Sequence, residues 1–218
     1  MIDSCHCEII RADVTPLSDP DLFEAWMARM PESRKRKVTA MRFAEGQRQR
    51  LGVGILLFQA LERLGIDGSA VRIAEGEFGQ PYLADRPEIR FSLSHAGKWA
   101  LCALSGAPVG CDAEETAGEN RERIADRFFH PEERDALAAE PDPTKRRLLF
   151  TRIWTRKESY LKATGKGITL GLETFSALRD GNGIWYGEGP AEENMVFSCC
   201  ALSDAKPVFD FRTGRLDL

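Results

Sequence analysis

The stretch Trp154–Lys162 has the spacing of an amphipathic helix, yet it carries charges where such a helix should be apolar. At about 100° per residue, the hydrophobic side chains between positions 149 and 164 fall on one stripe. Lys157 falls inside this stripe, whereas Glu158 and Lys162 lie on its edge in neighbouring turns. A buried charge is costly unless it is paired, ligates a metal or meets a charged ligand. We therefore expect the Lys157 ammonium to be paired inside the protein, and Lys162 to face a functional site.

The same spacing also fits a plain structural helix, in which Glu158 and Lys162 form an ion pair and Lys157 extends its ammonium to solvent. The rest of the sequence bears on this choice. The chain has 218 residues, of which 43% are hydrophobic and 29% charged, as is typical of globular proteins. It lacks both an apolar run of the ~20 residues that a membrane span needs and an N-terminal signal pattern. We therefore expect a cytoplasmic protein with no membrane partner.

Basic and acidic residues are concentrated in different parts of the chain. Eight basic residues and two acidic ones lie between Arg29 and Arg50, whereas eleven acidic residues and four arginines lie between Asp112 and Asp142. The first region suits an anion and the second a cation. The net charge of −4 argues against a nucleic-acid partner.

Hydrophobic patterns predict an α+β (α/β) fold of two similar halves, residues 1–105 and 106–218, each with an antiparallel sheet packed on helices. The order strand, helices, strands occurs twice in the chain. We expect helices at 21–30, 47–64, 121–137 with a break at His130-Pro131, and 145–164, and a further helix that begins at Pro31. We expect strands at 5–14, 71–73, 89–94, 99–104, 109–112, 168–178, 183–186, 195–202 and 208–211, with those at 89–112 forming an antiparallel meander.

Asp112 and Glu114 stand two residues apart at the end of a predicted strand, so their carboxylates lie on the same face. Carboxylate oxygens with room for water and a phosphate are the ligands that Mg²⁺ prefers. Surface acids are also common at strand ends, which leaves a structural interpretation open. Glu132 and Glu133 have an ordinary explanation too, because acidic residues in a first helical turn complement the helix dipole.

Five motifs resemble, in this order, those of the 4′-phosphopantetheinyl transferases of the surfactin-synthetase-activating (Sfp) type. They are Gly79-Gln80-Pro81, Phe91–His95 (FSLSH), Val109–Glu114 (VGCDAE), Arg127–Glu133 (RFFHPEE) and Trp154–Gly167 (WTRKESYLKATGKG). The similarity spans roughly residues 31–176. It implies a pseudo-twofold fold with coenzyme A and Mg²⁺ between the two halves, the first half supplying a basic coenzyme A-binding region and the second the metal site.

The resemblance also implies roles for single residues. The Mg²⁺ ligands would be Asp112, Glu114 and Glu158. Contacts to coenzyme A would come from Arg36, Arg48, Gln80, Ser94, His95 and Lys162. Catalysis would depend on Glu158, Lys162 and, as a general-base candidate, Glu133. Gln80 departs from the family pattern, because many members have lysine or arginine there, and we expect its loop to hold the nucleotide through the backbone.

The implied reaction is attack by a serine hydroxyl of an apo acyl or peptidyl carrier protein on the β-phosphate of coenzyme A, which releases adenosine 3′,5′-bisphosphate. The partner would be an acidic carrier protein, and the enzyme a monomer with pseudo-dimeric halves. Two other interpretations are a Mg²⁺-dependent nuclease and a non-catalytic binding module that uses the basic run at 34–37. The net charge weighs against the nuclease, and the binding module leaves the carboxylates unexplained.

Overall fold

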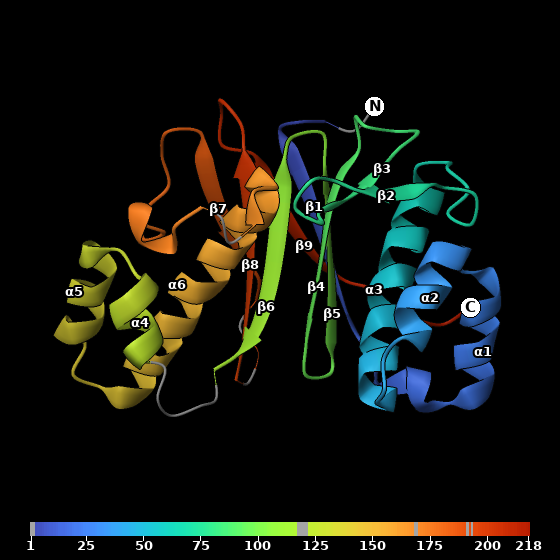
Figure 1. The fold of residues 1–218 in the computed structure, drawn as a ribbon, viewed down its shortest axis with the longest axis horizontal. Coiled ribbons are helices and arrows are strands. Elements are labelled where there is room, and N and C mark those ends of the chain that lie inside the picture. The colour runs from blue at the N-terminus through green and yellow to red at the C-terminus, as the bar shows by residue number, and fades with distance from the viewer. Residues whose placement is uncertain (1–2, 117–121, 168–169, 191, 193) are drawn as a thin grey trace.

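The structure is a computed structural model that describes residues 3–116, 122–167, 170–190, 192 and 194–218 (Figure 1). In chain order, its strands, α-helices and 3-10 helices (η) are β1 (His6–Asp13), η1 (Thr15–Ser18), α1 (Pro20–Arg29), α2 (Glu32–Thr39), α3 (Ala44–Arg63), β2 (Ile73–Glu75), β3 (Pro81–Leu83), β4 (Arg90–Ala96), β5 (Trp99–Ser105), β6 (Val109–Glu115), α4 (Glu122–Phe128), α5 (Pro131–Ala139), α6 (Pro143–Thr164), η3 (Leu172–Thr174), β7 (Ile184–Glu188), β8 (Met195–Leu202) and β9 (Val208–Thr213). No helix in the described part of the chain is both long and apolar enough to cross a membrane.

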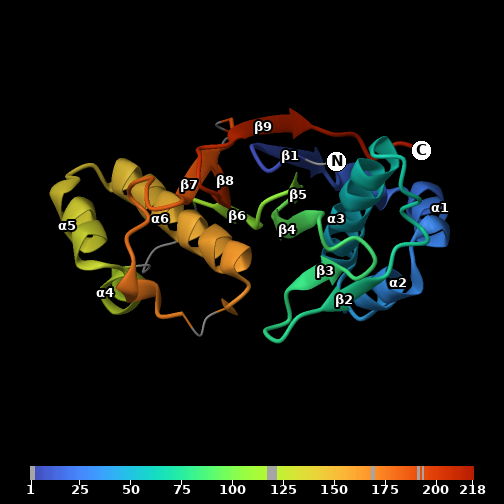
Figure 2. The same ribbon diagram turned by 90° about the horizontal axis from the view of Figure 1, so that it is seen from above.

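Two sheets lie face to face in the middle of the molecule, and helices cover their outer faces (Figures 1 and 2). The first sheet has the strand order β4-β5-β1-β9 and the second the order β6-β8-β7, while β2 and β3 form a separate hairpin. Helix α3 packs on the first sheet with α1 and α2 packed against it, and α6 packs on the second. The predicted α+β class with antiparallel sheets packed on helices is therefore confirmed.

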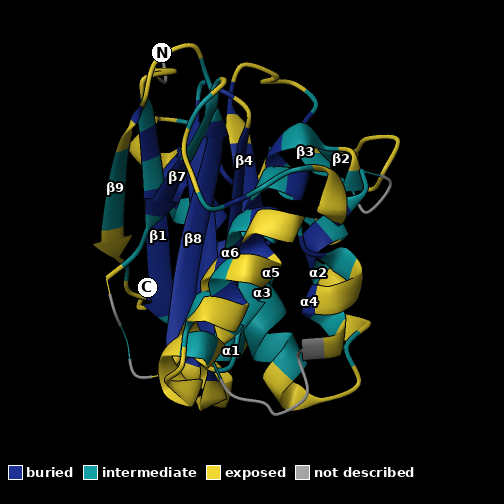
Figure 3. Ribbon diagram, turned by 90° about the vertical axis from the view of Figure 1, so that its left-hand side faces the viewer, coloured by how far each residue is buried: buried dark blue, intermediate teal, exposed yellow. Residues whose placement is uncertain are grey.

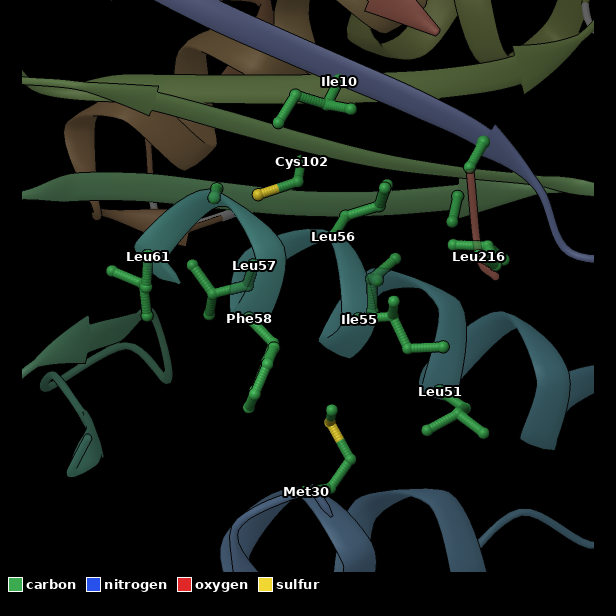
Figure 4. Packing of buried hydrophobic residues seen from close by; sticks show 14 of the residues in the cluster. Ile10, Met30, Leu51, Ile55, Leu56, Leu57, Phe58, Leu61, Cys102 and Leu216 are labelled. Carbon is green, nitrogen blue, oxygen red and sulfur yellow. The ribbon is translucent and has the colours of Figure 1, made fainter. Parts of the chain in front are cut away.

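Strand β1 is buried on both faces, because it lies between the helical layer and the second sheet (Figure 3). Ile10 packs with α3 residues such as Leu56 and Leu57 in one cluster (Figure 4). Its neighbour Ile9 points the other way and belongs to the cluster between the two sheets. Burying each large aliphatic side chain contributes about 1.5–3 kcal/mol, so the two clusters hold the layers together.

Two predictions about strands are wrong, and one parallel pairing was not predicted. Strand β6 does not continue the β4-β5 hairpin; it belongs to the second sheet, where Cys111 pairs with Cys199 of β8. Strand β9 pairs with β1 in parallel, with Ile9 opposite Phe211, so the first sheet is not wholly antiparallel. The predicted strand at 168–178 contains η3 in its described part, and residues 168–169 lie outside the described residues, as does Arg121 at the start of the predicted 121–137 helix.

The two predicted halves share a sheet. Strand β9 lies in the C-terminal half of the sequence, but it completes the first sheet beside β1. The division at residue 105 and a twofold relation between the halves stay predictions.

Helix α6 lies unusually close to β6, and Gly110 makes this approach possible. A Cβ atom at Gly110 would overlap Ser159 O and would lie 2.6 Å from Ala163 N and 2.9 Å from Lys162 Cβ. Real Cβ atoms essentially never come within 3.0 Å of other heavy atoms. The missing side chain of Gly110 therefore sets the height of the charged helix above β6.

We expect Gly110→Ala to push α6 away from β6 and to lower the free energy of unfolding by at least about 1–3 kcal/mol. Urea denaturation followed by circular dichroism measures this. Gly76→Ala is the matched control, because the nearest atom to its new Cβ is Gln80 O at 3.6 Å. A Gly110→Ala variant as stable as the wild type would contradict the close approach.

Candidate active site

Both ends of helix α6 are capped, which fixes the register of its charged residues. The Asp142 carboxylate accepts hydrogen bonds from the backbone N–H groups of Thr144 and Lys145 at 2.8 and 3.1 Å. Pro143 occupies the first helical position, where its missing N–H costs nothing. Gly165 ends the helix in the left-handed conformation with φ +67°. The charged motif is thus held at one place over the second sheet.

Lys162 joins three elements through its ammonium group. Its Nζ donates to Asp112 Oδ1 on β6 at 2.7 Å, to Ser94 Oγ on β4 at 3.1 Å and to Cys111 O at 3.0 Å. Ser94 Oγ in turn donates to Asp112 Oδ1 at 2.8 Å. The Lys162 side chain is 31% exposed and that of Asp112 only 8%, so the ammonium remains accessible to a ligand while the carboxylate does not. The ion pair of Lys162 is therefore with Asp112 on the facing strand, not with its helical neighbour Glu158.

Glu158 lies in the field of two other carboxylates. Burial raises its pKa above the usual value, and the charges of Asp112 and Glu114 raise it further, while Lys162 opposes them. Lys162 shows the complementary effect: burial lowers its pKa, but Asp112 and Glu158 outweigh burial, and the net shift is upward. A carboxylate with a raised pKa is a better proton acceptor than an ordinary one.

The donor chemistry of this cluster fits a hard divalent cation such as Mg²⁺. Asp112 Oδ2 is buried without a hydrogen-bond partner, although its other oxygen has two. Two further carboxylates, Glu114 and Glu158, stand close enough to affect each other's ionisation. Among the residues that the structure describes, no group of three or more His, Cys, Asp or Glu side chains is gathered tightly enough to hold a metal ion. The predicted ligand set therefore stays a prediction.

Glu133 does not fit the predicted role of general base. Its side chain is fully buried, and its Oε2 lies 2.8 Å from Lys157 Nζ. The same carboxylate accepts hydrogen bonds from the backbone N–H of His130 at 2.8 Å and of Ala177 at 2.6 Å. The first of these bonds belongs to the capping box of α5. A carboxylate enclosed and bonded in this way cannot accept a proton from a protein substrate.

Lys157 has the structural role that its place in the apolar stripe predicts. Besides Glu133, its ammonium donates to Leu172 O and Phe175 O, both at 2.7 Å, and lies 4.3 Å from the centre of the Phe175 ring. Burial lowers its pKa, and Glu133 opposes the shift. The pair links α6 to the start of α5 and to the segment after α6.

The basic region at 34–37 borders a separate cavity of about 350 Å³. Arg36 and Lys37 line this cavity and are exposed, and Lys37 forms an ion pair with Glu75 at 2.6 Å. Arg34 also lines it but is only 5% exposed, and burial together with the charge of Arg50 lowers the pKa of Arg34 to about 10. This cavity can therefore attract an anion.

Two further predicted phosphate contacts, Arg48 and His95, lie on α3 and β4. Arg48 is half-buried in α3. His95, on β4, has a pKa lowered first by burial and then by the charges of Arg50 and Lys162. An imidazole in the field of two cations is neutral at pH 7, so it can donate a hydrogen bond to a phosphate without a charge of its own.

A second cavity, of about 260 Å³, opens beside Glu158 and Lys162. Its walls are the hairpin loop at 78–81, strand β4 and the C-terminal end of α6. Gln80 lines it, but the Gln80 side chain is engaged: Nε2 donates to Lys162 O at 2.6 Å. The structure thus brings Gln80, Ser94, Asp112, Glu158 and Lys162 together.

The sequence pattern misplaces the serines of β4. Alternation predicts Ser92 and Ser94 to face outward, yet they are only 5% and 8% exposed because β4 lies against β6. Ser92 Oγ accepts a hydrogen bond from Cys111 N at 3.0 Å. One feature of the sequence could have indicated this burial. An exposed strand usually carries long charged side chains, whereas this strand has two small hydroxyl side chains. The sequence also did not reveal the burial of Arg34 or the charge effect of Arg50 on Arg34 and His95, because a basic stretch does not show which of its members is buried or near which group.

Comparisons with known proteins agree with this geometry. Residues 108–201 match the model of a family described as the 4′-phosphopantetheinyl transferase superfamily. The chain is 34% identical over 146 residues to the 4′-phosphopantetheinyl transferase Sfp of Bacillus subtilis (strain 168), across 67% of this chain but only 64% of that protein. It is 32% identical over 212 residues to the phosphopantetheinyl transferase of a Thraustochytrium species, across 87% of this chain and 67% of that protein. The crystal structure of Thermotoga maritima holo-[acyl-carrier-protein] synthase matches 45% of this chain and 64% of that chain, with 18% identity and a TM-score of 0.34.

We expect Lys157→Met to lower the free energy of unfolding by about 3–5 kcal/mol, because it leaves the Glu133 carboxylate buried without its counter-charge. Thermal and urea denaturation measure the loss. Lys145→Met, at an exposed position of the same helix, is the matched control and should change stability by less than about 0.5 kcal/mol.

Glu133→Gln separates the structural role of Glu133 from the catalytic one. It should destabilise the protein as Lys157→Met does, because an amide cannot neutralise the buried ammonium. A general base would give the opposite pattern, a normally stable protein with a lower kcat, and that result would restore Glu133 to the catalytic set.

Proposed function

Because the chain belongs to the 4′-phosphopantetheinyl transferase superfamily, we propose that it transfers the 4′-phosphopantetheine arm of coenzyme A to a serine of an apo carrier protein. The observation that carries the proposal is the meeting of Lys162 with Asp112, Glu114 and Glu158 at the edge of a cavity between β4 and α6. Carboxylates that could hold a divalent cation, with a lysine beside them at a solvent-accessible cavity, suit a phosphoryl group, which is negatively charged and needs cations around it.

In the proposed reaction the serine Oγ of the carrier attacks the β-phosphorus of coenzyme A. A bond forms between Oγ and phosphorus, and the bond from phosphorus to the oxygen that bridges the two phosphates breaks. Glu158, directly or through a water, takes up the serine proton. Lys162 holds the phosphoryl oxygens, and the product that leaves is adenosine 3′,5′-bisphosphate.

Asp112, Glu114 and Glu158 are the residues that would hold Mg²⁺. When bound, the ion would neutralise the charge that develops on the pyrophosphate. The buried, unpartnered Asp112 Oδ2 and the carboxylate neighbours of Glu158 support this assignment.

The basic residues on the other side of the site bind the rest of coenzyme A. Arg36 lines the larger cavity, and Arg48 and His95 lie between that cavity and the carboxylates in the proposed arrangement.

The carrier is an acidic acyl or peptidyl carrier protein, and the enzyme works as a cytoplasmic monomer. The nuclease and the binding module find no support among the matched relatives, which are named as phosphopantetheinyl transferases.

Mass spectrometry tests the activity directly. A panel of apo carrier proteins incubated with this protein, coenzyme A and Mg²⁺ should gain one phosphopantetheine each for the carriers that are substrates. The same mixture with excess EDTA should gain none, because the metal would be removed. No mass gain on any carrier in the presence of Mg²⁺ would refute the transferase proposal.

Glu158→Gln should abolish this transfer while leaving stability at pH 7 equal to or above that of the wild type. Burial and neighbouring carboxylates raise the pKa of Glu158, so its ionised form is disfavoured in the folded state, and a neutral amide relieves that cost. Transfer assays and urea denaturation are the two measurements. Transfer at the wild-type rate by Glu158→Gln would remove Glu158 from both the ligand set and the base role.

A further inference from the structure

The base of the β2–β3 hairpin is anchored in the core by Leu83, which is 1% exposed, whereas residues 76–79 of its loop are exposed and have few anchors. The hairpin is a two-stranded sheet outside the two main sheets, and isolated hairpins of this size are marginally stable in water. Its loop is closed by hydrogen bonds between Gly76 N and Gln80 O at 2.8 Å and between Gly79 N and Gly76 O at 2.9 Å. Its first strand is tied to α2 by the exposed ion pair of Glu75 with Lys37. What holds the loop toward the site must come from elsewhere.

That contact comes from the end of α6. Figure 2 shows the hairpin and the C-terminal end of α6 lying side by side. The Gln80 amide donates to Lys162 O at 2.6 Å, and this carbonyl is one of the last four of the helix, which have no partner within the helix. Gln80 thus caps a helix that lies more than eighty residues further along the chain.

Gly165 makes room for this cap. A Cβ at position 165 would overlap Gln80 Oε1, so only glycine allows the amide to lie there. Gly165 also has φ +67°, which a residue with a side chain adopts at a cost. The position of the Gln80 amide therefore depends on the absence of a side chain at Gly165.

We propose that Gln80 is a positioning residue that clamps the hairpin loop onto the C-terminal end of α6, and so fixes the wall of the coenzyme A cavity beside Lys162. This rests on the proposed function for the identity of the ligand, but not for the clamp itself. Gln80 and Gly165 line the same cavity as Glu158 and Lys162. Because the Gln80 amide already bonds a backbone carbonyl in the free protein, its main contribution is to hold the loop before a ligand arrives.

Hydrogen exchange of the free protein, followed by mass spectrometry, tests the clamp without coenzyme A. Gln80→Met keeps the length of the side chain but removes the donor, and it should speed exchange of the amides at 76–80 about 2- to 10-fold, as expected for one lost hydrogen bond. Glu77→Met places the same side chain at an exposed position of the same loop and should leave these rates unchanged. Unchanged exchange in Gln80→Met would overturn the clamp and leave Gln80 as a direct ligand contact.

A variant on the other side of the contact gives an independent check. Gly165→Ala should also speed exchange at 76–80, because the new methyl group displaces Gln80 Oε1. Because Gly165→Ala also strains the end of α6, its result is interpreted together with that of Gln80→Met. Wild-type exchange at 76–80 in Gly165→Ala would contradict the proposal.

Calorimetric titration with coenzyme A tests the positioning role. Gln80→Met should raise the Kd about 2- to 10-fold and Glu77→Met should not. If Gln80→Met speeds hydrogen exchange at 76–80 but leaves the Kd for coenzyme A unchanged, the contact is structural only and its proposed role in positioning the cavity wall is wrong. If the wild-type protein does not bind coenzyme A at all, the proposed function fails, and the exchange experiment still decides the clamp.

Discussion

The ion pair of Lys162 with Asp112 is the contact on which the arrangement of the site depends. Asp112 is almost fully buried on β6, and a carboxylate in such a place needs a positive partner. Helix α6 supplies this partner, because Gly110 lets the helix come close enough for Lys162 to reach Asp112. Ser94 brings the first sheet into the same network through β4. One buried charge thus holds both sheets and the helix in a fixed relation.

Helix α6 carries two lysines with opposite roles, and their surroundings decide which is which. Lys157 points into the space between α5 and the segment after α6, where a carboxylate, two carbonyls and an aromatic ring enclose it. Lys162, more than one turn later, has the same chemistry but remains partly exposed beside a cavity. Both ammonium groups have three partners inside the protein, but the Lys157 side chain is fully buried whereas that of Lys162 is partly exposed, so Lys162 can exchange a protein partner for a ligand.

The carboxylate cluster around Glu158 suits the proposed reaction but lowers the stability of the folded protein. Burial and the neighbouring carboxylates of Asp112 and Glu114 disfavour the ionised form of Glu158, and its raised pKa reflects that cost. Such a cost persists in a folded protein when the surrounding structure outweighs it, as the capped helix and the two apolar clusters do here. The hairpin loop adds the remaining wall, held by a side-chain amide instead of by sheet pairing.

The sequence by itself determined the helices and most strands, because apolar spacing and capping residues act locally. The end of α6 at Thr164, followed by Gly165, is an example. The order of the motifs also sufficed to indicate the family, since it needs no geometry. Tertiary structure alone decided which strands pair. Strand β6 pairs with β8 instead of continuing the predicted β4-β5-β6 meander, and β9 pairs with β1 in parallel.

The same division holds for the site. Sequence placed Lys157 in the apolar stripe and Lys162 at its edge, but it could not show that Glu133 is the buried partner of the first. Nor could it show that Ser94 faces another strand, or that Gln80 reaches the end of α6. Each of these contacts joins residues far apart in the chain. A periodic pattern gives the direction of a side chain relative to its own element, and only packing gives the group it meets there.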